Sequence, residues 1–260
     1  MARETAEDRQ RKLLQPFTYV SQIPGKNVRG RLIQAFQKWL QAPDEVVDAI
    51  QHVVHELHNA SLLYRVQALG EPKAIEVFVH EMLKLHEGQG LDIFWRDHLQ
   101  CPTMDEYIEM VQNKTGGLFR LAISLIQAFS SCTLDFVPLL NSIAVYFQIR
   151  DDYLNLVNEE YMQNKSYCED LSEGKFSYPL VVAIRENPND TRLLNILKQR
   201  TKNVEIKKQA VDYLKETGVM QRTLEKLNVL AVEIHDELAK LGGNPAIEKI
   251  LTVLHATLTK

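Results

Sequence analysis

Two adjacent carboxylates lie inside the longest apolar stretch of this 260-residue sequence. The run 137–156 has no helix breaker after its second residue, so we expect one helix that is apolar nearly all round and central in the fold. On that helix Asp151 and Asn155 would share a face, with Asp152 beside them and Gln148 one turn earlier. Oxygen-bearing side chains over one turn suit Mg²⁺, which takes one or two carboxylates from a protein and completes its shell with water or phosphate.

The same Asp pair has a simpler interpretation. A buried, unpaired carboxylate is costly or takes up a proton. Asp151 and Asp152 would avoid that cost on a solvated edge, paired with Arg150 or a lysine. Residues elsewhere in the chain favour the metal site over this alternative.

Basic residues near the start of the chain could bind an anion. Lys26 and Arg29 follow a Pro-Gly turn and stand at an expected helix start, where backbone N–H groups and the helix dipole favour negative charge. They would hold a diphosphate, Arg29 by its planar fork and Lys26 as a point charge; the alternative is a solvated basic turn. His58, near the end of the helix that starts around Asp44, could donate to a phosphate oxygen, although a lone helical histidine is more often structural.

Two glycines interrupt an otherwise helical pattern over residues 74–95. Gly88 and Gly90 each cost about 1 kcal/mol against alanine in a helix, so we expect another group to approach the backbone there. Asp92 follows on the same helix and could face the same site as Asp151.

A bend is expected where Lys114 and Thr115 precede the glycine pair at 116–117. A helical pattern on both sides predicts a kink or an unwound turn that offers an ammonium and a hydroxyl to a ligand. The alternative is a tight joint between two helices. Upstream, Thr103 and Glu106 fit a capping box that starts the helix.

The segment 164–179 reads as a polar loop just downstream of the carboxylates. It carries Lys165 and Lys175, ten residues apart, which could cover a phosphate bound by metal. The last third, 191–260, is helical and poor in chemistry, with a break at 242–245 before a final helix. We interpret it as structural.

Composition favours one all-α domain over residues 1–260, with a polar tail at 1–14. Only 11 glycines and 9 prolines leave little room for the turns of a β protein. A net charge of −4 without a basic block argues against nucleic acid binding. No window approaches the roughly 18 apolar residues of a membrane span. The 3 scattered cysteines fit reduced thiols and a cytoplasmic location.

Taken together, these segments are similar to the trans-prenyltransferases (polyprenyl diphosphate synthases), and most closely to the animal geranylgeranyl diphosphate synthases. The resemblance extends from about Gln15 to the break at 243–245. Six segments carry it: 24–29, 58–63, 88–92, 114–119, 147–155 and 169–179. It implies an antiparallel helical bundle of the isoprenoid synthase type, usually a homo-oligomer, that uses Mg²⁺ to join isopentenyl diphosphate to an allylic diphosphate such as farnesyl diphosphate.

The resemblance also implies a role for individual residues. Asn155 stands where many relatives have a third aspartate. Isopentenyl diphosphate would be bound by Lys26, Arg29 and His58; the allylic diphosphate by Lys114, Thr115, Gln148, Lys165 and Lys175; and Mg²⁺ by Asp151, Asp152, Asn155 and Asp92.

One part of the family pattern is missing. The first aspartate-rich motif should directly follow 58–63, but Leu63 is followed by Tyr64, which resembles family sequence several turns further on. Roughly 40 residues are absent, on the order of 60 Å of helix, and the nearest acid is Glu71. We expect weak metal binding, a catalytic loss of at least about 10²–10³-fold, and exposed apolar surface where a wall of the bundle is lost.

Three hypotheses remain open from sequence. The first is a prenyltransferase that makes geranylgeranyl diphosphate. The second is a non-catalytic isoform that forms hetero-oligomers with a full-length synthase and modulates it. The third is an isoprenoid- or diphosphate-binding protein without turnover.

Overall fold

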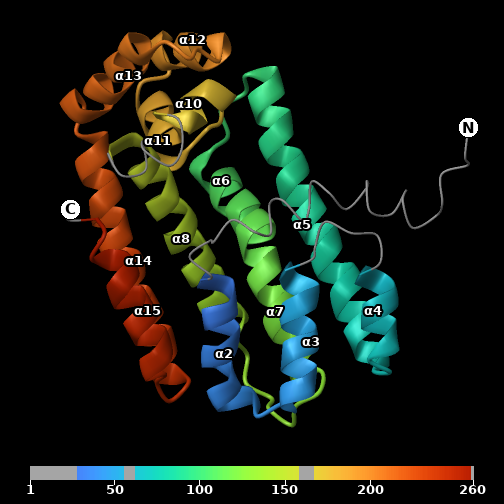
Figure 1. Cartoon of the computed structure of the whole chain (residues 1–260). Helices are drawn as coiled ribbons and strands as arrows, with labels where there is room; N and C mark the ends of the chain where they lie inside the picture. The colour runs from blue at the N-terminus through green and yellow to red at the C-terminus, as the bar shows by residue number, and fades with distance from the viewer. Residues whose placement is uncertain (1–27, 56–61, 158–166, 259–260) are drawn as a thin grey trace, which may run out of the picture.

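Helices form the structure, and no strand occurs in the residues that the structure describes, which confirms the all-α expectation. The computed structural model describes residues 28–55, 62–157 and 167–258 (Figure 1). In chain order the helices are α2 (Val28–Leu40), α3 (Asp44–His55), α4 (Leu62–Ala68), α5 (Pro72–His98), α6 (Met104–Val111), the π-helical turn η1 (Gln112–Gly116), α7 (Gly117–Gln127), α8 (Val137–Val157), α10 (Glu169–Glu173), α11 (Tyr178–Glu186), α12 (Arg192–Gln199), α13 (Val204–Glu216), α14 (Val219–Lys240) and α15 (Pro245–His255).

The helix α8 is central, as its apolar pattern predicts. It packs against α14 on one side and against α6, η1 and α7 on the other, and α10 and α11 also contact it. Its buried residues run from Leu139 to Leu156 and lie on several sides of the helix. A helix enclosed by neighbours on several sides has no continuous solvated face, which explains its lack of amphipathic pattern.

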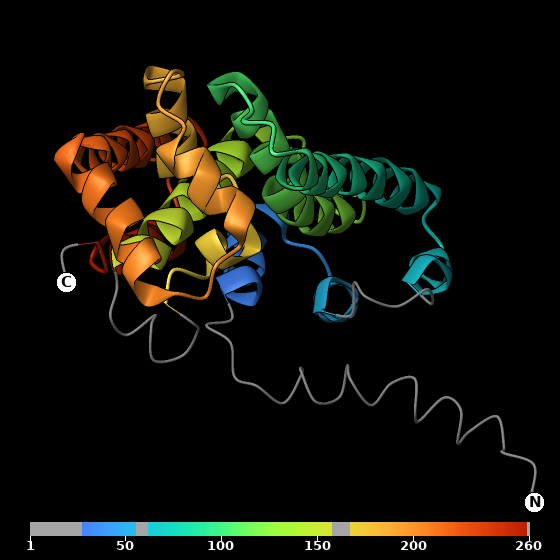
Figure 2. The ribbon, with the colours of Figure 1, turned by 90° about the horizontal axis from the view of Figure 1, so that it is seen from above.

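The long helices form an antiparallel bundle. Along the chain, α5, the α6–α7 segment, α8 and α14 alternate in direction (Figure 1). Figure 2 shows α5 and α14 on opposite sides of α8. The helices α2 and α3 pack on α7, and α15 packs on α2. Because α8 contacts α6, η1 and α11 together, side chains from these elements can meet in the interior.

The predicted bend before the glycine pair is a π-helical turn. The turn η1 contains Lys114, Thr115 and Gly116, and α7 continues directly from Gly117. It packs closely on Gly88 of α5, where an added Cβ would lie 2.5 Å from the backbone nitrogen of Lys114. The close approach expected at Gly88 is therefore confirmed.

The same expectation is wrong for Gly90. A Cβ built there would meet nothing within 4 Å. Two residues further along α5 from Gly88, the glycine has turned away from η1, because successive helical residues are about 100° apart.

Other boundaries agree with the sequence, with one correction. Thr103 and Glu106 form the predicted capping box at the start of α6, and α14 and α15 are separated by the predicted break. The segment expected as a polar loop contains the short helix α10, with Leu171 and Asp170 buried. Burial of part of this segment against α8 and α12 gives it structure that its polar composition does not suggest.

No helix among the described residues is long and apolar enough to cross a membrane.

Candidate active site

Asp152 is the centre of a buried hydrogen-bond network. Its side chain is fully buried, and four donors converge on its two oxygens. Oδ1 accepts from Gln148 Nε2 at 2.8 Å and from Lys175 Nζ at 2.9 Å. Oδ2 accepts from the Tyr107 hydroxyl at 2.5 Å and from the backbone N–H of Tyr178 at 2.7 Å. A buried carboxylate with this many donors, one of them a cation, avoids the cost of an unpaired charge.

Four elements supply these partners. Gln148 lies one turn before Asp152 on α8, so helical spacing alone brings the two together. Tyr107 comes from α6, whose capping box fixes the start of that helix. Lys175 lies in the connection between α10 and α11, and Tyr178 is the first residue of α11.

Lys175 lies between two acids. Its ammonium is 2.9 Å from Asp152 Oδ1 and 3.1 Å from Asp170 Oδ2, and its side chain is 13% exposed. Burial lowers the pKa of Lys175, but the charges of Asp152 and Asp170 outweigh it and hold the pKa above the usual value. Lys175 is therefore a cation at neutral pH.

Asp170 has the opposite balance. Burial raises its pKa to about 7, against the lowering effect of Lys175 and with a further rise from the charge of Asp152. Asp170 thus titrates near neutral pH, while Lys175 stays a cation.

The turn η1 joins the network through Thr115. The Thr115 hydroxyl donates to Gln148 Oε1 at 2.9 Å, and Gln148 in turn donates to Asp152. The preceding residue, Lys114, forms an ion pair with Asp92 of α5 at 2.5 Å. Lys114 is 28% exposed and Asp92 only 7%, so the pair lies at the edge of the interior.

The structure therefore brings together four of the five residues predicted to bind the allylic diphosphate. Lys114, Thr115, Gln148 and Lys175 lie on connected elements around Asp152. Lys26, His58 and Lys165 lie outside the described residues. Arg29 lies in the first turn of α2, and the structure describes only its backbone.

The predicted metal ligands do not form a ready-made cluster. No group of three or more His, Cys, Asp or Glu that could hold a metal occurs in the described ranges. The oxygens of Asp152 are taken up by four donors, Asn155 Oδ1 accepts the Asp170 N–H at 3.2 Å, and Asp92 pairs with Lys114. Asp151 is half-buried. A Mg²⁺ ion would need its remaining ligands from phosphate oxygens and water.

Two residues of the network were not predicted from sequence. Tyr107 is buried, and burial followed by the charge of Asp152 raises its pKa well above the usual range, so it remains a neutral donor. A buried tyrosine hydroxyl usually has a partner, which was the available signal. For Asp170 the available signal was its place in the segment 169–179, which carries the family resemblance, five residues before Lys175.

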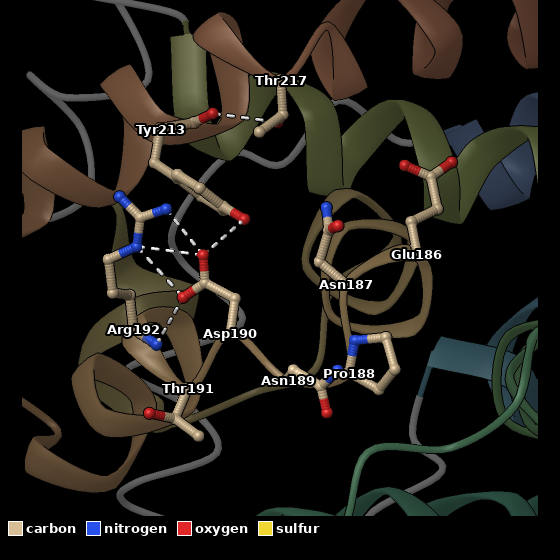
Figure 3. Close-up of a pocket in the computed structure, with 9 residues that line it drawn as sticks. All are labelled: Glu186, Asn187, Pro188, Asn189, Asp190, Thr191, Arg192, Tyr213 and Thr217. Carbon is tan, nitrogen blue, oxygen red and sulfur yellow. Dashed lines mark hydrogen bonds and ion pairs between the residues drawn. The ribbon is translucent and has the colours of Figure 1, made fainter.

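An open hollow of about 760 Å³ lies apart from this network (Figure 3). It is lined by the connection between α11 and α12 and by α13. Arg192 donates to Asp190 at 2.6 Å and stacks over the Tyr213 ring, and the Tyr213 hydroxyl also donates to Asp190. The carboxylate of Asp190 and the guanidinium of Arg192 are thus paired with each other. The hollow therefore offers no set of groups for chemistry comparable to the network around Asp152.

A helical bundle with lysines, a hydroxyl and carboxylates gathered at its central helix matches the class of isoprenoid synthases that the sequence resembles. The sequence profile of the polyprenyl synthetase family matches residues 63–214, more than half of the chain. This chain belongs to the polyprenyl synthetase family.

Several relatives cover almost the whole chain. A protein named terpene synthase from Matsumurasca onukii is 43% identical over 95% of this chain and 94% of its own length. Geranylgeranyl pyrophosphate synthases from Dictyostelium discoideum and Mucor circinelloides f. lusitanicus are 41% and 39% identical, covering 94% and 95% of this chain and 93% and 94% of their own lengths. These names support a transferase of isoprenoid biosynthesis.

Proposed function

We propose that this chain is a Mg²⁺-dependent prenyltransferase of the geranylgeranyl diphosphate synthase type. It would condense isopentenyl diphosphate with an allylic diphosphate such as farnesyl diphosphate. The observation that carries the proposal is the joint placement of Lys114, Thr115 and Lys175 around the buried Asp152. Relatives named geranylgeranyl pyrophosphate synthase support it.

The reaction begins with heterolysis of the allylic carbon–oxygen bond. The diphosphate leaves with the electron pair, and an allylic cation remains. The alkene of isopentenyl diphosphate donates its π electrons to form the new carbon–carbon bond, and loss of a proton restores an alkene. The protein's main task is to stabilise the charge that builds up on the leaving diphosphate in a site that excludes water.

The two lysines suit this task in different ways. Lys175 is held rigidly, because two of its three ammonium donors bind Asp152 and Asp170. Lys114 is more exposed and is held by one acid, Asp92, so it can be shared with an arriving diphosphate. The Thr115 hydroxyl and the Gln148 amide would add neutral hydrogen bonds. Lys165 is proposed to act with them, and Lys26, Arg29 and His58 to bind isopentenyl diphosphate.

Mg²⁺ would add charge neutralisation of the diphosphate. The proposed protein ligands are Asp151, Asp152, Asn155 and Asp92, and all four already have interaction partners in the folded chain. The site would therefore bind metal together with diphosphate rather than alone.

Comparisons support the proposal that a segment is missing. The family match starts at residue 63, which is where the predicted junction lies. The alignment with the Matsumurasca onukii protein runs over 286 positions, more than the 260 residues of the chain. Because the alignment covers 95% of this chain, about 40 of the 286 aligned positions are gaps in this chain. A missing first aspartate-rich motif would leave one side of the diphosphate without its metal ligands.

The test is a turnover assay. The purified chain, its intact mass confirmed, is incubated with Mg²⁺, farnesyl diphosphate and labelled isopentenyl diphosphate. The proposal predicts a labelled C20 diphosphate, formed slowly because of the missing motif, and lost in Lys114→Gln. The matched control is Lys84→Gln, which removes an exposed lysine of α5 that pairs with Glu87.

Formation of a different product, or of no product, would contradict the proposed synthase activity. A hydrocarbon without diphosphate would align the chain with the relative named terpene synthase. No product from a chain that is folded by circular dichroism would reject catalysis and leave the second candidate.

The second candidate function is a non-catalytic subunit that binds a full-length synthase. A specific observation favours it: α5 carries an exposed apolar stripe of Val79, Leu83 and Phe94, which are 46–60% exposed. These residues are spaced by four and eleven, so they share one face of the helix. Apolar faces of this kind mark interaction surfaces.

Native mass spectrometry tests this candidate. The chain is mixed with a full-length geranylgeranyl diphosphate synthase. Mixed oligomers are expected, together with homo-oligomers of the chain, and only separate species would exclude the role.

A cytoplasmic location is part of the proposal. The three free cysteines support it. Microscopy of the tagged chain would test it.

A further inference from the structure

Arg120 is a buried arginine next to the π-helical turn. It lies on α7 and is 7% exposed. Its Nε donates to Glu81 Oε2 of α5 at 3.0 Å. Its Nη1 donates to the backbone carbonyl of Gln112, the first residue of η1, at 2.8 Å, and to Asn141 Oδ1 of α8 at 2.7 Å. One guanidinium thus connects α5, η1, α7 and α8.

The space for this guanidinium is provided by Gly116. A Cβ at Gly116 would lie 3.0 Å from Arg120 Nη1, 3.3 Å from the Ala144 Cβ and 3.6 Å from Asn141 Oδ1. The last residue of η1 therefore has to be small for Arg120 to reach the carbonyl of the first. The Arg120 side chain and the η1 turn therefore have complementary shapes.

The charge of Arg120 is neutralised locally. Glu81, with its side chain 10% exposed, is its ion-pair partner, and removal of one member of a buried pair is strongly unfavourable. The planar guanidinium donates from two separate nitrogens, Nε to an acid and Nη1 to a carbonyl, and the single ammonium nitrogen of a lysine cannot reproduce that geometry.

The winding of η1 decides where Lys114 and Thr115 point. A π-turn contains one more residue than an α-helical turn. If η1 rewound as α-helix, residues on one side of it would rotate by about 100° relative to those on the other. Lys114 and Thr115, in the middle of the turn, would then lose their present direction toward Asp92 and Gln148.

We infer that Arg120 is a positioning residue: it holds the Gln112 carbonyl and so keeps the π-turn wound with Lys114 and Thr115 facing the site. The inference depends on the proposed function only for the identity of the ligand, a diphosphate.

Two measurements test it in Arg120→Met, which keeps the length of the side chain but removes its donors and charge. Amide hydrogen exchange over 112–117 should be at least tenfold faster than in the parent chain. Calorimetry with Mg²⁺ and inorganic diphosphate should show affinity at least tenfold weaker. The matched control is Lys207→Met, which removes another buried cation that donates to a carbonyl, that of Tyr167.

The control distinguishes positioning from general loss of stability. Lys207→Met should leave exchange at 112–117 and diphosphate affinity unchanged. Arg120→Lys should rescue exchange only in part. The inference is overturned if exchange at 112–117 is unchanged in Arg120→Met, or if it rises equally in Lys207→Met.

A second variant covers failure of Arg120→Met to fold. Gly116→Ala places a methyl group against Nη1 and should accelerate exchange in the same segment, whereas Gly90→Ala, with open space around it, should not. If the parent chain binds no diphosphate, the proposed function fails, and the exchange comparison still decides the role of Arg120.

Discussion

At the scale of single residues, Asp152 is predicted from sequence as a metal ligand, and the structure surrounds it with protein donors. Four donors occupy its two oxygens, and its side chain has no exposed surface. We infer that it orients Lys175 and Gln148.

The hydroxyl of Tyr107 should contribute measurably to stability. Tyr107→Phe removes one of two donors to Asp152 Oδ2 inside the core, and we expect a loss of about 1–3 kcal/mol. Urea unfolding measures it. The control is Tyr153→Phe, because the Tyr153 hydroxyl makes no hydrogen bond to the described residues. Equal losses in both variants would mean that the bond to Asp152 contributes nothing specific.

Asp170 should make stability depend on pH. Its pKa is raised from 3.8 to about 7 in the folded chain, mainly by burial. The folded state therefore keeps a proton that the unfolded state has lost, and stability falls as pH rises from about 4 to about 7.

Asp170→Asn should remove this dependence. Between pH 4 and pH 7 the parent chain should lose on the order of 3–4 kcal/mol relative to the variant. Denaturant unfolding at a series of pH values measures the difference. Parallel pH profiles for the two proteins would contradict a raised pKa at Asp170.

At the scale of elements, contact between α5 and η1 determines which glycine is essential. A Cβ at Gly88 would lie 2.5 Å from a backbone nitrogen and 2.9 Å from the Met110 carbonyl oxygen. Backbone atoms cannot move aside as a flexible side chain can, so α5 or η1 would have to shift.

Alanine at the two glycines of α5 should therefore have opposite effects. Gly88→Ala should destabilise the chain by about 1–3 kcal/mol through overpacking. Gly90→Ala should stabilise it by up to about 1 kcal/mol through helix propensity. Thermal unfolding of both variants checks the signs. Destabilisation by Gly90→Ala would show that its outer face is covered, for instance in an oligomer.

At the scale of the whole molecule, the outer face of α5 is the place where a partner would bind. The stripe of Val79, Leu83 and Phe94 faces away from α7 and η1, and buried Ala74, Phe78, Glu81 and Gly88 form the inner face. Three large apolar side chains are therefore exposed together on this helix.

The double variant Leu83→Glu, Phe94→Glu should weaken self-association or binding to a full-length synthase at least tenfold. Desolvation of two carboxylates in an apolar interface is the physical reason. Sedimentation or native mass spectrometry measures it. The control is Val232→Glu, which changes an apolar residue of α14 that is 61% exposed. A loss of association in the control as well would place the interface elsewhere.

Sequence predicted the fold well because the relevant signals are local. Continuous apolarity marked α8 as central, Thr103 and Glu106 marked the start of α6, and Gly-Gly-Asn-Pro marked the break before α15. Prediction from sequence failed in α10, where burial gives structure to a polar segment. It also failed to distinguish Gly88 from Gly90, which lie on different faces of the same helix.

By itself, the sequence determined the family, the helical class and the set of lysines, carboxylates and amides that gather around α8. The helical class follows from composition and from apolar spacing along one chain. The family and the site residues follow from resemblance to known sequences, which also needs no knowledge of spatial neighbours. Only the tertiary structure decided what each of them does there: that Asp152 is saturated by Tyr107, Lys175 and two further donors, and that Arg120 reaches back to the turn that carries Lys114. The physical reason is that burial and hydrogen-bond partners come from elements far apart in sequence, and they decide which groups remain accessible.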